Sequence, residues 1–178
     1  MKITKIDLSF VPVVTRVPLK FGDQTLTEVS CARVAVHVED GDKSAVGWAE
    51  TPLSVAWVWP SKLGYLERED RLKAFCRVLR DDLVAHGECG HPFVIGHRYI
   101  EDRLHGRLAE ENEGFGEDAG MPHLAGLVCL SAFDLALYDA FGKLHNVGAF
   151  DCLDQSWVGE TDRSHFPEPA ESLLGKLQ

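Results

Sequence analysis

Positive charge is scarce in this sequence. Its 178 residues include 18 Lys and Arg against 28 Asp and Glu, which gives a formal net charge of −10, and no block of basic residues interrupts the acidic balance. Such a chain would repel a phosphate backbone. We therefore expect no nucleic acid among its partners.

Long apolar runs are lacking as well. Lys2, Lys5 and Asp7 fall within the short apolar stretch at the N-terminus, so the apolar region that a signal peptide needs is not found there. No apolar run approaches the roughly 20 residues of a membrane span. The sequence thus predicts a cytoplasmic protein that does not enter a membrane.

Paired cysteines and metal motifs are also missing. The five cysteines are widely spaced, odd in number and without a Cys-x-x-Cys pair, which favours reduced thiols over a disulfide framework. Cys89 and His91 are too close in sequence for the paired ligands of a structural zinc site. The acidic stretch 110–118 lacks the residue order of a calcium loop. No nucleophile triad or phosphate loop is found either, so we expect no catalytic residue, metal site or cofactor in this chain.

The composition that remains is that of one ordinary globular domain, with 45% hydrophobic and 26% charged residues. Period-two alternation predicts three strands, each with one buried face: 5–10, 32–39 and 44–50. The turn residues 40–42 (DGD) predict a hairpin between the second strand and the third. The segment 11–27 contains Pro12, Pro18 and Gly22, and its composition predicts an extended or irregular excursion, much of it a loop, in place of a regular element.

Helical periodicity follows Pro60. The predicted helices run over about 72–83, 97–108 and 123–144. The last of them is apolar nearly all round, which indicates burial on several sides and predicts that this chain alone leaves an apolar patch of the helix exposed. Strands followed by helices predict an α+β fold, here a three-stranded antiparallel meander followed by a helical bundle.

Two stretches of the chain resemble a known family. Gly47-Trp48-Ala49-Glu50, and the later run 131–143 (SAFDLALYDAFGK), resemble the N-terminal capping domain of the enolase superfamily, in the group of mandelate racemase and muconate lactonizing enzyme. The resemblance assigns residues 1–150 to an enolase-like capping domain. It leaves 151–178 as a diverged tail or the start of a missing catalytic barrel.

The resemblance also implies a chemistry for an intact family member. Such enzymes abstract the proton α to a carboxylate and stabilise the product on Mg²⁺, as racemases, dehydratases or cycloisomerases, with the base and the metal ligands on barrel strands. This chain lacks the barrel, so we expect it to be inactive alone. The implied partner is the barrel in cis, a barrel-containing subunit or a second copy of the chain. The alternative is a free-standing binding or dimerisation module with the cap fold.

Family caps close over the barrel with two loops, which the resemblance places here at 15–25 and 51–59. Arg16 and Lys20 would steer a carboxylate, and apolar side chains would wall a pocket. The candidate substrate-contacting residues are Arg16, Lys20, Phe21, Thr51, Leu53, Trp57 and Trp59. In the competing interpretation the two cations are solvated charges and the two tryptophans pack their loop against the first helix.

Two carboxylates of the last predicted helix look catalytic at first sight. Asp139 and Lys143 are four residues apart with the acid first, which predicts an ion pair on one helix face. A structural role is therefore the stronger interpretation for Asp139. Asp134 is predicted to bond to neighbouring backbone or to groups of the missing barrel.

Overall fold

The computed structural model describes residues 1–21, 24–116, 118–153 and 157. Its sheet contains β1 (Lys2–Phe21), β2 (Gln24–Asp40) and β3 (Lys43–Pro52), all antiparallel and in the order β1-β2-β3. Gly41, with φ of 61°, lies in the turn between β2 and β3, in the left-handed region that glycine enters without a Cβ penalty. The predicted three-stranded meander is therefore confirmed.

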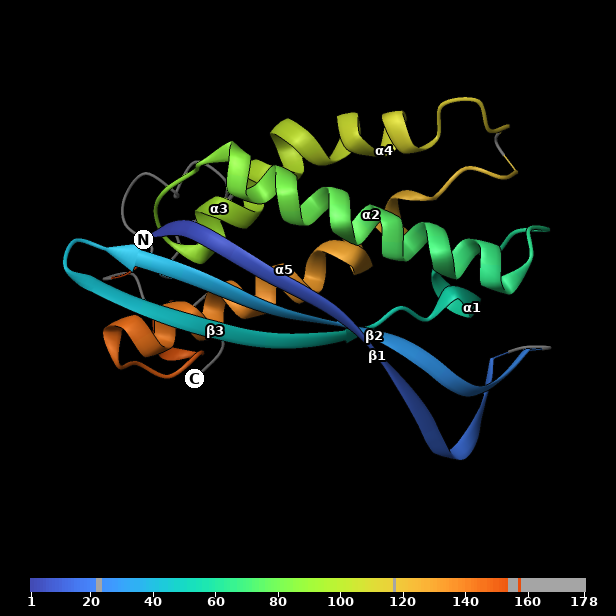
Figure 1. The fold of residues 1–178 in the computed structure, drawn as a ribbon, viewed down its shortest axis with the longest axis horizontal. Coiled ribbons are helices and arrows are strands. Elements are labelled where there is room, and N and C mark those ends of the chain that lie inside the picture. The colour runs from blue at the N-terminus through green and yellow to red at the C-terminus, as the bar shows by residue number, and fades with distance from the viewer. Residues whose placement is uncertain (22–23, 117, 154–156, 158–178) are drawn as a thin grey trace, which may run out of the picture.

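The helices cover one face of this sheet (Figure 1). They are α1 (Val55–Val58), α2 (Tyr65–His86), α3 (Pro92–Tyr99), a π-helical turn (Ile100–Leu104), α4 (His105–Glu111), α5 (His123–His145) and a 3₁₀ turn (Asp151–Leu153). Helix α5 packs along β3 and β2, and α2 packs on α5 and β1. Val34, Val36 and Val38 of β2 are buried between the two layers. The predicted α+β class is confirmed.

Small side chains determine how closely α5 approaches β3. Gly47 of β3 lies so close to the helix that a Cβ there would fall 2.0 Å from the Ala136 carbonyl oxygen and 2.3 Å from the Ala140 nitrogen. Ala132, Ala136 and Ala140 recur every four residues and are fully buried, so they form one small-residue face of the helix. Sheet and helix are thus in near backbone contact at Gly47.

Helix α5 also has, over its most apolar window, the length and composition of a membrane-spanning helix. It contains no long uninterrupted apolar run, because Asp134 and Asp139 fall within it. More than half of that window, 56%, is buried inside the fold. The helix is therefore accounted for as the central element of the core.

Two predictions about the elements were wrong. The segment 11–27, expected to be largely a loop, forms the outer parts of β1 and β2, which bend away from the rest of the molecule as a long arm (Figure 1). The helix expected from 97 starts at Pro92, where proline occupies the first turn and the ring of His91 accepts a hydrogen bond from Phe93 N.

The predicted boundary at residue 150 remains a prediction. Residues 151–153 form the 3₁₀ turn, in which Cys152 is buried. Most of the remaining segment up to 178 lies outside the described residues.

Candidate functional site

The arm is made by the outer halves of β1 and β2, residues 11–21 and 24–31. Its register breaks between Val14, which pairs with Glu28, and Leu19, which pairs with Leu26. Residues 15–18 therefore stand opposite Thr27 alone, and the Thr15 hydroxyl donates to the Thr27 carbonyl at 3.1 Å. This bulge leaves Val14 and Val17 exposed, at 74% and 68%. The arm thus presents apolar side chains that nothing in the described part of the chain covers.

One face of the arm carries its own small apolar cluster. Leu26, Val29 and Cys31 are buried there, apart from the main core. Val13 pairs with Val29 and Leu19 with Leu26, so these residues extend the same face. Both of them remain partly exposed. The arm is therefore a two-stranded ribbon whose apolar face is only partly buried.

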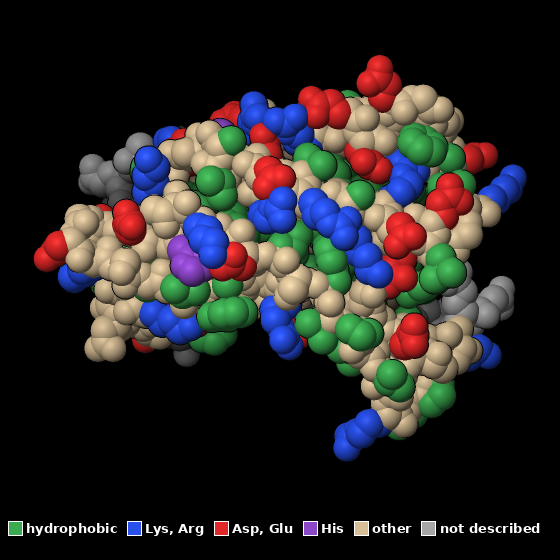
Figure 2. Space-filling view, viewed as in Figure 1, with side chains coloured by type: hydrophobic (Ala, Val, Ile, Leu, Met, Phe, Trp, Pro, Cys, Tyr) green, Lys and Arg blue, Asp and Glu red, His purple; other side chains and the backbone are tan. Residues whose placement is uncertain are grey.

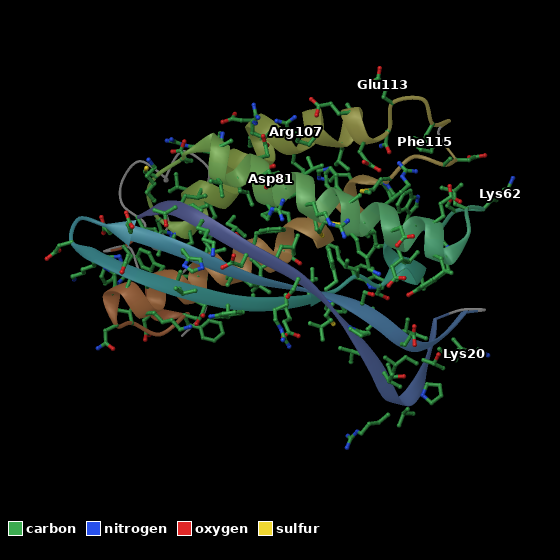
Figure 3. The ribbon with its side chains drawn as sticks, in the orientation of Figure 1. Lys20, Lys62, Asp81, Arg107, Glu113 and Phe115 are labelled. Carbon is green, nitrogen blue, oxygen red and sulfur yellow. The ribbon has the colours of Figure 1, made fainter. Side chains whose placement is uncertain are left out.

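The two predicted cations lie on this arm. Arg16 lies in the bulge and Lys20 close to the end of β1, and both side chains are exposed. Figure 3 shows Lys20 at the far end of the arm, directed outward. Phe21 ends β1, and its side chain lies outside what the structure describes. A substrate role for these three residues stays a prediction.

The second predicted segment, 51–59, leads from β3 into α1. Leu53 N donates to the Ser30 carbonyl at 2.8 Å, which fastens this segment to the base of the arm. Leu53 and Trp59 are buried in the main core, Trp59 with 1% exposure, whereas Trp57 is 49% exposed. Of these three apolar candidates, Trp57 is the one whose side chain is largely exposed. Their substrate role also remains a prediction.

Thr51 connects the end of β3 to α5. Its hydroxyl lies 2.9 Å from that of Ser131, which itself donates to the Val128 carbonyl at 2.8 Å. Because the Ser131 proton is used in that bond, Thr51 is the donor to Ser131. The hydroxyl of Thr51 is therefore engaged within the fold.

The two family-like stretches contact each other. Trp48 N donates to Oδ2 of Asp139 at 2.7 Å, and Lys143 Nζ donates both to the Val46 carbonyl at 3.1 Å and to Asp139 at 2.6 Å. β3 is an edge strand, and these side chains satisfy main-chain groups that an edge leaves unpaired. The predicted Asp139–Lys143 pair is confirmed, and its role is structural.

Arg71 holds the acidic loop before α5, which the sequence did not reveal. Its guanidinium lies between the rings of Phe115 and Trp59, 3.8 and 4.8 Å from their centroids. It donates to the Glu111 carboxylate at 2.9 Å and to the Ala119 carbonyl at 2.9 Å. Partners 40 to 48 residues away carry no signal in local periodicity.

A buried carboxylate joins α2 to the two helices that follow. Asp82 accepts hydrogen bonds from the Tyr99 hydroxyl at 2.9 Å, from Arg103 at 2.6 Å and from Arg107. Burial alone would raise the pKa of Asp82, but these bonds outweigh it and hold the pKa far below its usual range. The group stays ionised and paired across the π-helical turn, which suits a structural role.

Asp134 has a different environment from these paired acids. Its Oδ1 lies 2.6 Å from where a Cβ on Gly96 of α3 would be, so glycine makes room for the carboxylate. Burial raises the pKa of Asp134 to about 6. Among the residues that the structure describes, no hydrogen bond or ion pair to this carboxylate is found. It is therefore a partly buried acid without compensation.

The described part of the chain has open hollows on its surface. One, of about 440 Å³, is lined by Trp59, Pro60, Ser61, Lys62, Asp118, Gly120 and Pro122. Another, of about 380 Å³, lies along the end of α5 and includes Tyr138 and Lys143. Of the predicted site residues whose side chains the structure describes, only Trp59 lines either one. The described residues also contain no group of three or more His, Cys, Asp or Glu that could hold a metal ion.

This geometry defines an α+β domain with a projecting arm. No family model and no curated protein matches the sequence. Among solved structures the chain is similar to the L-Ala-D/L-Glu epimerase from Bacillus subtilis in a substrate-liganded complex, with 21% identity and a TM-score of 0.52, over 86% of this chain and 34% of that chain.

A second solved structure is a mandelate racemase/muconate lactonizing enzyme-like protein from Rubrobacter xylanophilus. It has 14% identity and a TM-score of 0.43, over 85% of this chain and 33% of that chain. The chain therefore spans about a third of the length of these structures. The likeness to the epimerase shows a shared fold, and with it the predicted resemblance to enolase-superfamily chains is confirmed at the level of fold.

Proposed function

We propose that this chain is the capping part of a larger enzyme of the mandelate racemase and muconate lactonizing type. The fold likeness to a chain roughly three times as long carries the proposal. In the intact protein a second, barrel-type domain would provide the proton-abstracting base. The capping part would close over the substrate and exclude water.

Uncovered apolar surface supports this proposal. Val14, Val17 and Leu19 of the arm are exposed, as is Trp57 after β3. Figure 2 shows the molecule hollowed between the arm and the body. Exposed apolar side chains that gather on neighbouring elements are typical of surfaces that another domain or a ligand covers. The arm is thus suited to closing over something outside this chain.

Magnesium does not fit the residues present. Mg²⁺ prefers carboxylate and water oxygens in octahedral geometry, and the described part of the chain brings no three acidic or histidine side chains together. Any Mg²⁺ would have to be held by the second domain. The contribution proposed for this chain is binding and closure, with Arg16 and Lys20 attracting an anionic substrate.

The first test is the intact mass of the native gene product, purified from its own cells. We expect a product at least twice the 19.7 kDa of this chain, because a barrel adds roughly 250 residues. A product of 19.7 kDa would refute the capping function and favour the free-standing binding module. Finding the longer product would justify an activity assay.

That assay would follow deuterium uptake from D₂O at carbon α of a panel of carboxylates, with Mg²⁺ added. We expect exchange with at least one substrate. The double variant Arg16→Ala/Lys20→Ala should lower kcat/KM about tenfold or more through KM, because long-range attraction of an anion is lost. The matched control is Lys62→Ala, which removes a cation outside the arm; an equal loss there would contradict a steering role.

A further inference from the structure

The helices pack on one face of the sheet (Figure 1), and every second residue of the inner strands points to the opposite face. Asp7, Ala35 and Trp48 form one row of that face across the three strands, with Asp7 opposite Ala35 and Ala35 opposite Trp48. Ala35 is buried in this row, whereas Trp48 is 57% exposed. A large indole ring therefore projects from the open face of the sheet into solvent.

Paired charges surround Trp48 on this face. In the next row, Arg33 stands opposite Glu50, and the Arg33 Nε lies 2.6 Å from the Glu50 Oε1. Along β1, the Lys5 Nζ lies 2.7 Å from the Asp7 Oδ1. Charges that already have a partner of opposite sign lose less when a second surface excludes water from them than isolated charges do.

The open face also differs from the whole chain in its net charge. The chain carries a formal charge of −10. Strand alternation places three basic and three acidic residues on the face, so that their formal charges cancel: Lys2, Lys5, Arg33, Asp7, Glu39 and Glu50. Two copies of so acidic a protein repel each other, and the repulsion is weakest where the facing surfaces are locally neutral. Adjacent charges of opposite sign can also complement themselves across a two-fold axis.

We propose that the open face of the sheet, centred on Trp48, is a contact between two copies of this chain. The indole rings of the two copies pack at its centre, and the charged pairs form its polar rim. Sheets that pack face to face lie about 10 Å apart, a gap that large side chains fill. Three strands form a small face, so the dimer is weak, with a Kd on the order of 10 µM. This contact is independent of the proposed capping function.

Sedimentation velocity of the 178-residue chain tests the contact. We expect mostly monomer at about 1 µM and mostly dimer at about 100 µM. Trp48→Glu brings like charges together at the centre and should raise Kd at least tenfold, whereas Trp48→Phe keeps an aromatic ring and should retain the dimer. The matched control is Trp57→Glu, which alters a tryptophan of similar exposure, 49%, outside the sheet and should leave Kd unchanged.

Lysine acetylation gives a measurement that needs no substitution. Lys5 lies on the open face and Lys62 lies outside it, and both side chains are exposed. The parent chain would be treated with an N-hydroxysuccinimide ester of acetate at about 1 µM and about 100 µM protein, followed by peptide mass spectrometry. Lys5 should be modified about threefold less at the higher concentration, and Lys62 equally at both.

Three results would overturn the contact between copies. The first is a chain that stays monomeric at about 100 µM with Lys5 equally labelled at both concentrations. The second is a dimer that survives Trp48→Glu. Leu135 of α5 is 53% exposed, as the predicted apolar patch on that helix requires, and the third is a dimer that is lost in Leu135→Glu but not in Trp48→Glu.

The outcomes also separate this contact from the capping function. In a longer native product, protection of Lys5 that does not depend on protein concentration would identify the second domain as the occupant. That result would overturn the contact between copies and leave the capping function standing. A native product of 19.7 kDa that dimerises through Trp48 would do the reverse.

Discussion

Both halves of the β1–β2 hairpin contain valine residues, but these are buried in one half and exposed in the other. Val34, Val36 and Val38 lie in the inner half and are buried under α5 and α2, whereas Val14 and Val17 lie in the outer half and are exposed. Valine prefers strands in both places because its branched side chain fits a pleated surface. The strand conformation therefore extends beyond the core, whereas the layer of helices covers only the inner half of the hairpin.

The largest loss of stability is expected from a change at the contact between the sheet and α5. Gly47→Val would place side-chain carbon against the backbone of Ala136 and Ala140, where even a Cβ is too close. We expect a loss of about 3 kcal/mol or more in the free energy of unfolding, measured by urea denaturation.

Gly106→Ala is the matched control for that substitution. Nothing lies within 4 Å of a Cβ at Gly106, which is in α4. Alanine should therefore stabilise this helix by about 0.5–1 kcal/mol. Equal effects at the two glycines would contradict the close approach of α5 to β3.

The next largest loss of stability is expected at the edge of β3. Asp139→Ala removes the acceptor of Trp48 N and the partner of Lys143. We expect the free energy of unfolding, measured by thermal unfolding, to fall by about 1–2 kcal/mol, as for the loss of a partly exposed hydrogen bond to a charged group. Asp81→Ala, which removes an exposed acid paired with its neighbour Arg80, should change stability by less than about 0.5 kcal/mol. A similar loss from both would argue against the role of Asp139 at the strand edge.

The stability of the chain should also depend on pH through the carboxyl group of Asp134. Its folded pKa of about 6 is above the unfolded value of 3.8, so the folded chain binds the proton more tightly and its stability falls as pH rises from about 4 to 6. Asp134→Asn removes this dependence. We expect the variant to be about 1–2 kcal/mol more stable than the parent at pH 7, a gain that disappears near pH 4. A gain that is the same at both pH values would contradict burial as its cause.

The smallest effect is expected in the outer half of the hairpin. Val17→Ser should change the free energy of unfolding of this chain by less than about 0.5 kcal/mol, because its side chain is already exposed. Val36→Ser, the same exchange in the inner half, should cost several times more, about 2 kcal/mol or above. Comparable losses from both substitutions would show that the arm is packed in solution.

The sequence predicted the elements whose burial is regular. The inner strands and α5 were predicted because their apolar periods match the layers they face, and the Asp139–Lys143 pair because its partners lie one helical turn apart. The arm was missed because residues 15–18 interrupt the alternation and Pro12 and Pro18 favour irregular chain. In the arm, the strand conformation of β1 depends on its pairing with β2, and local composition does not encode that pairing.

The candidate site was predicted less well, for a related reason. The sequence placed Leu53 and Trp59 in a closing loop, but which tryptophan points inward depends on how α1 folds onto α2 and α5. Arg71 was missed because its partners are distant in sequence. The proline at 92 was a signal for the start of α3 that periodicity alone overlooked.

The side chains on the β3 edge also limit how wide this sheet can become. An edge strand with free N–H and C=O groups can recruit a strand from another molecule and so initiate aggregation. Here the Trp48 N–H and the Val46 carbonyl are already bonded to Asp139 and Lys143. An incoming strand would first have to displace an ion pair, so along this part of β3 the protein prevents its own polymerisation with the helix that forms its core.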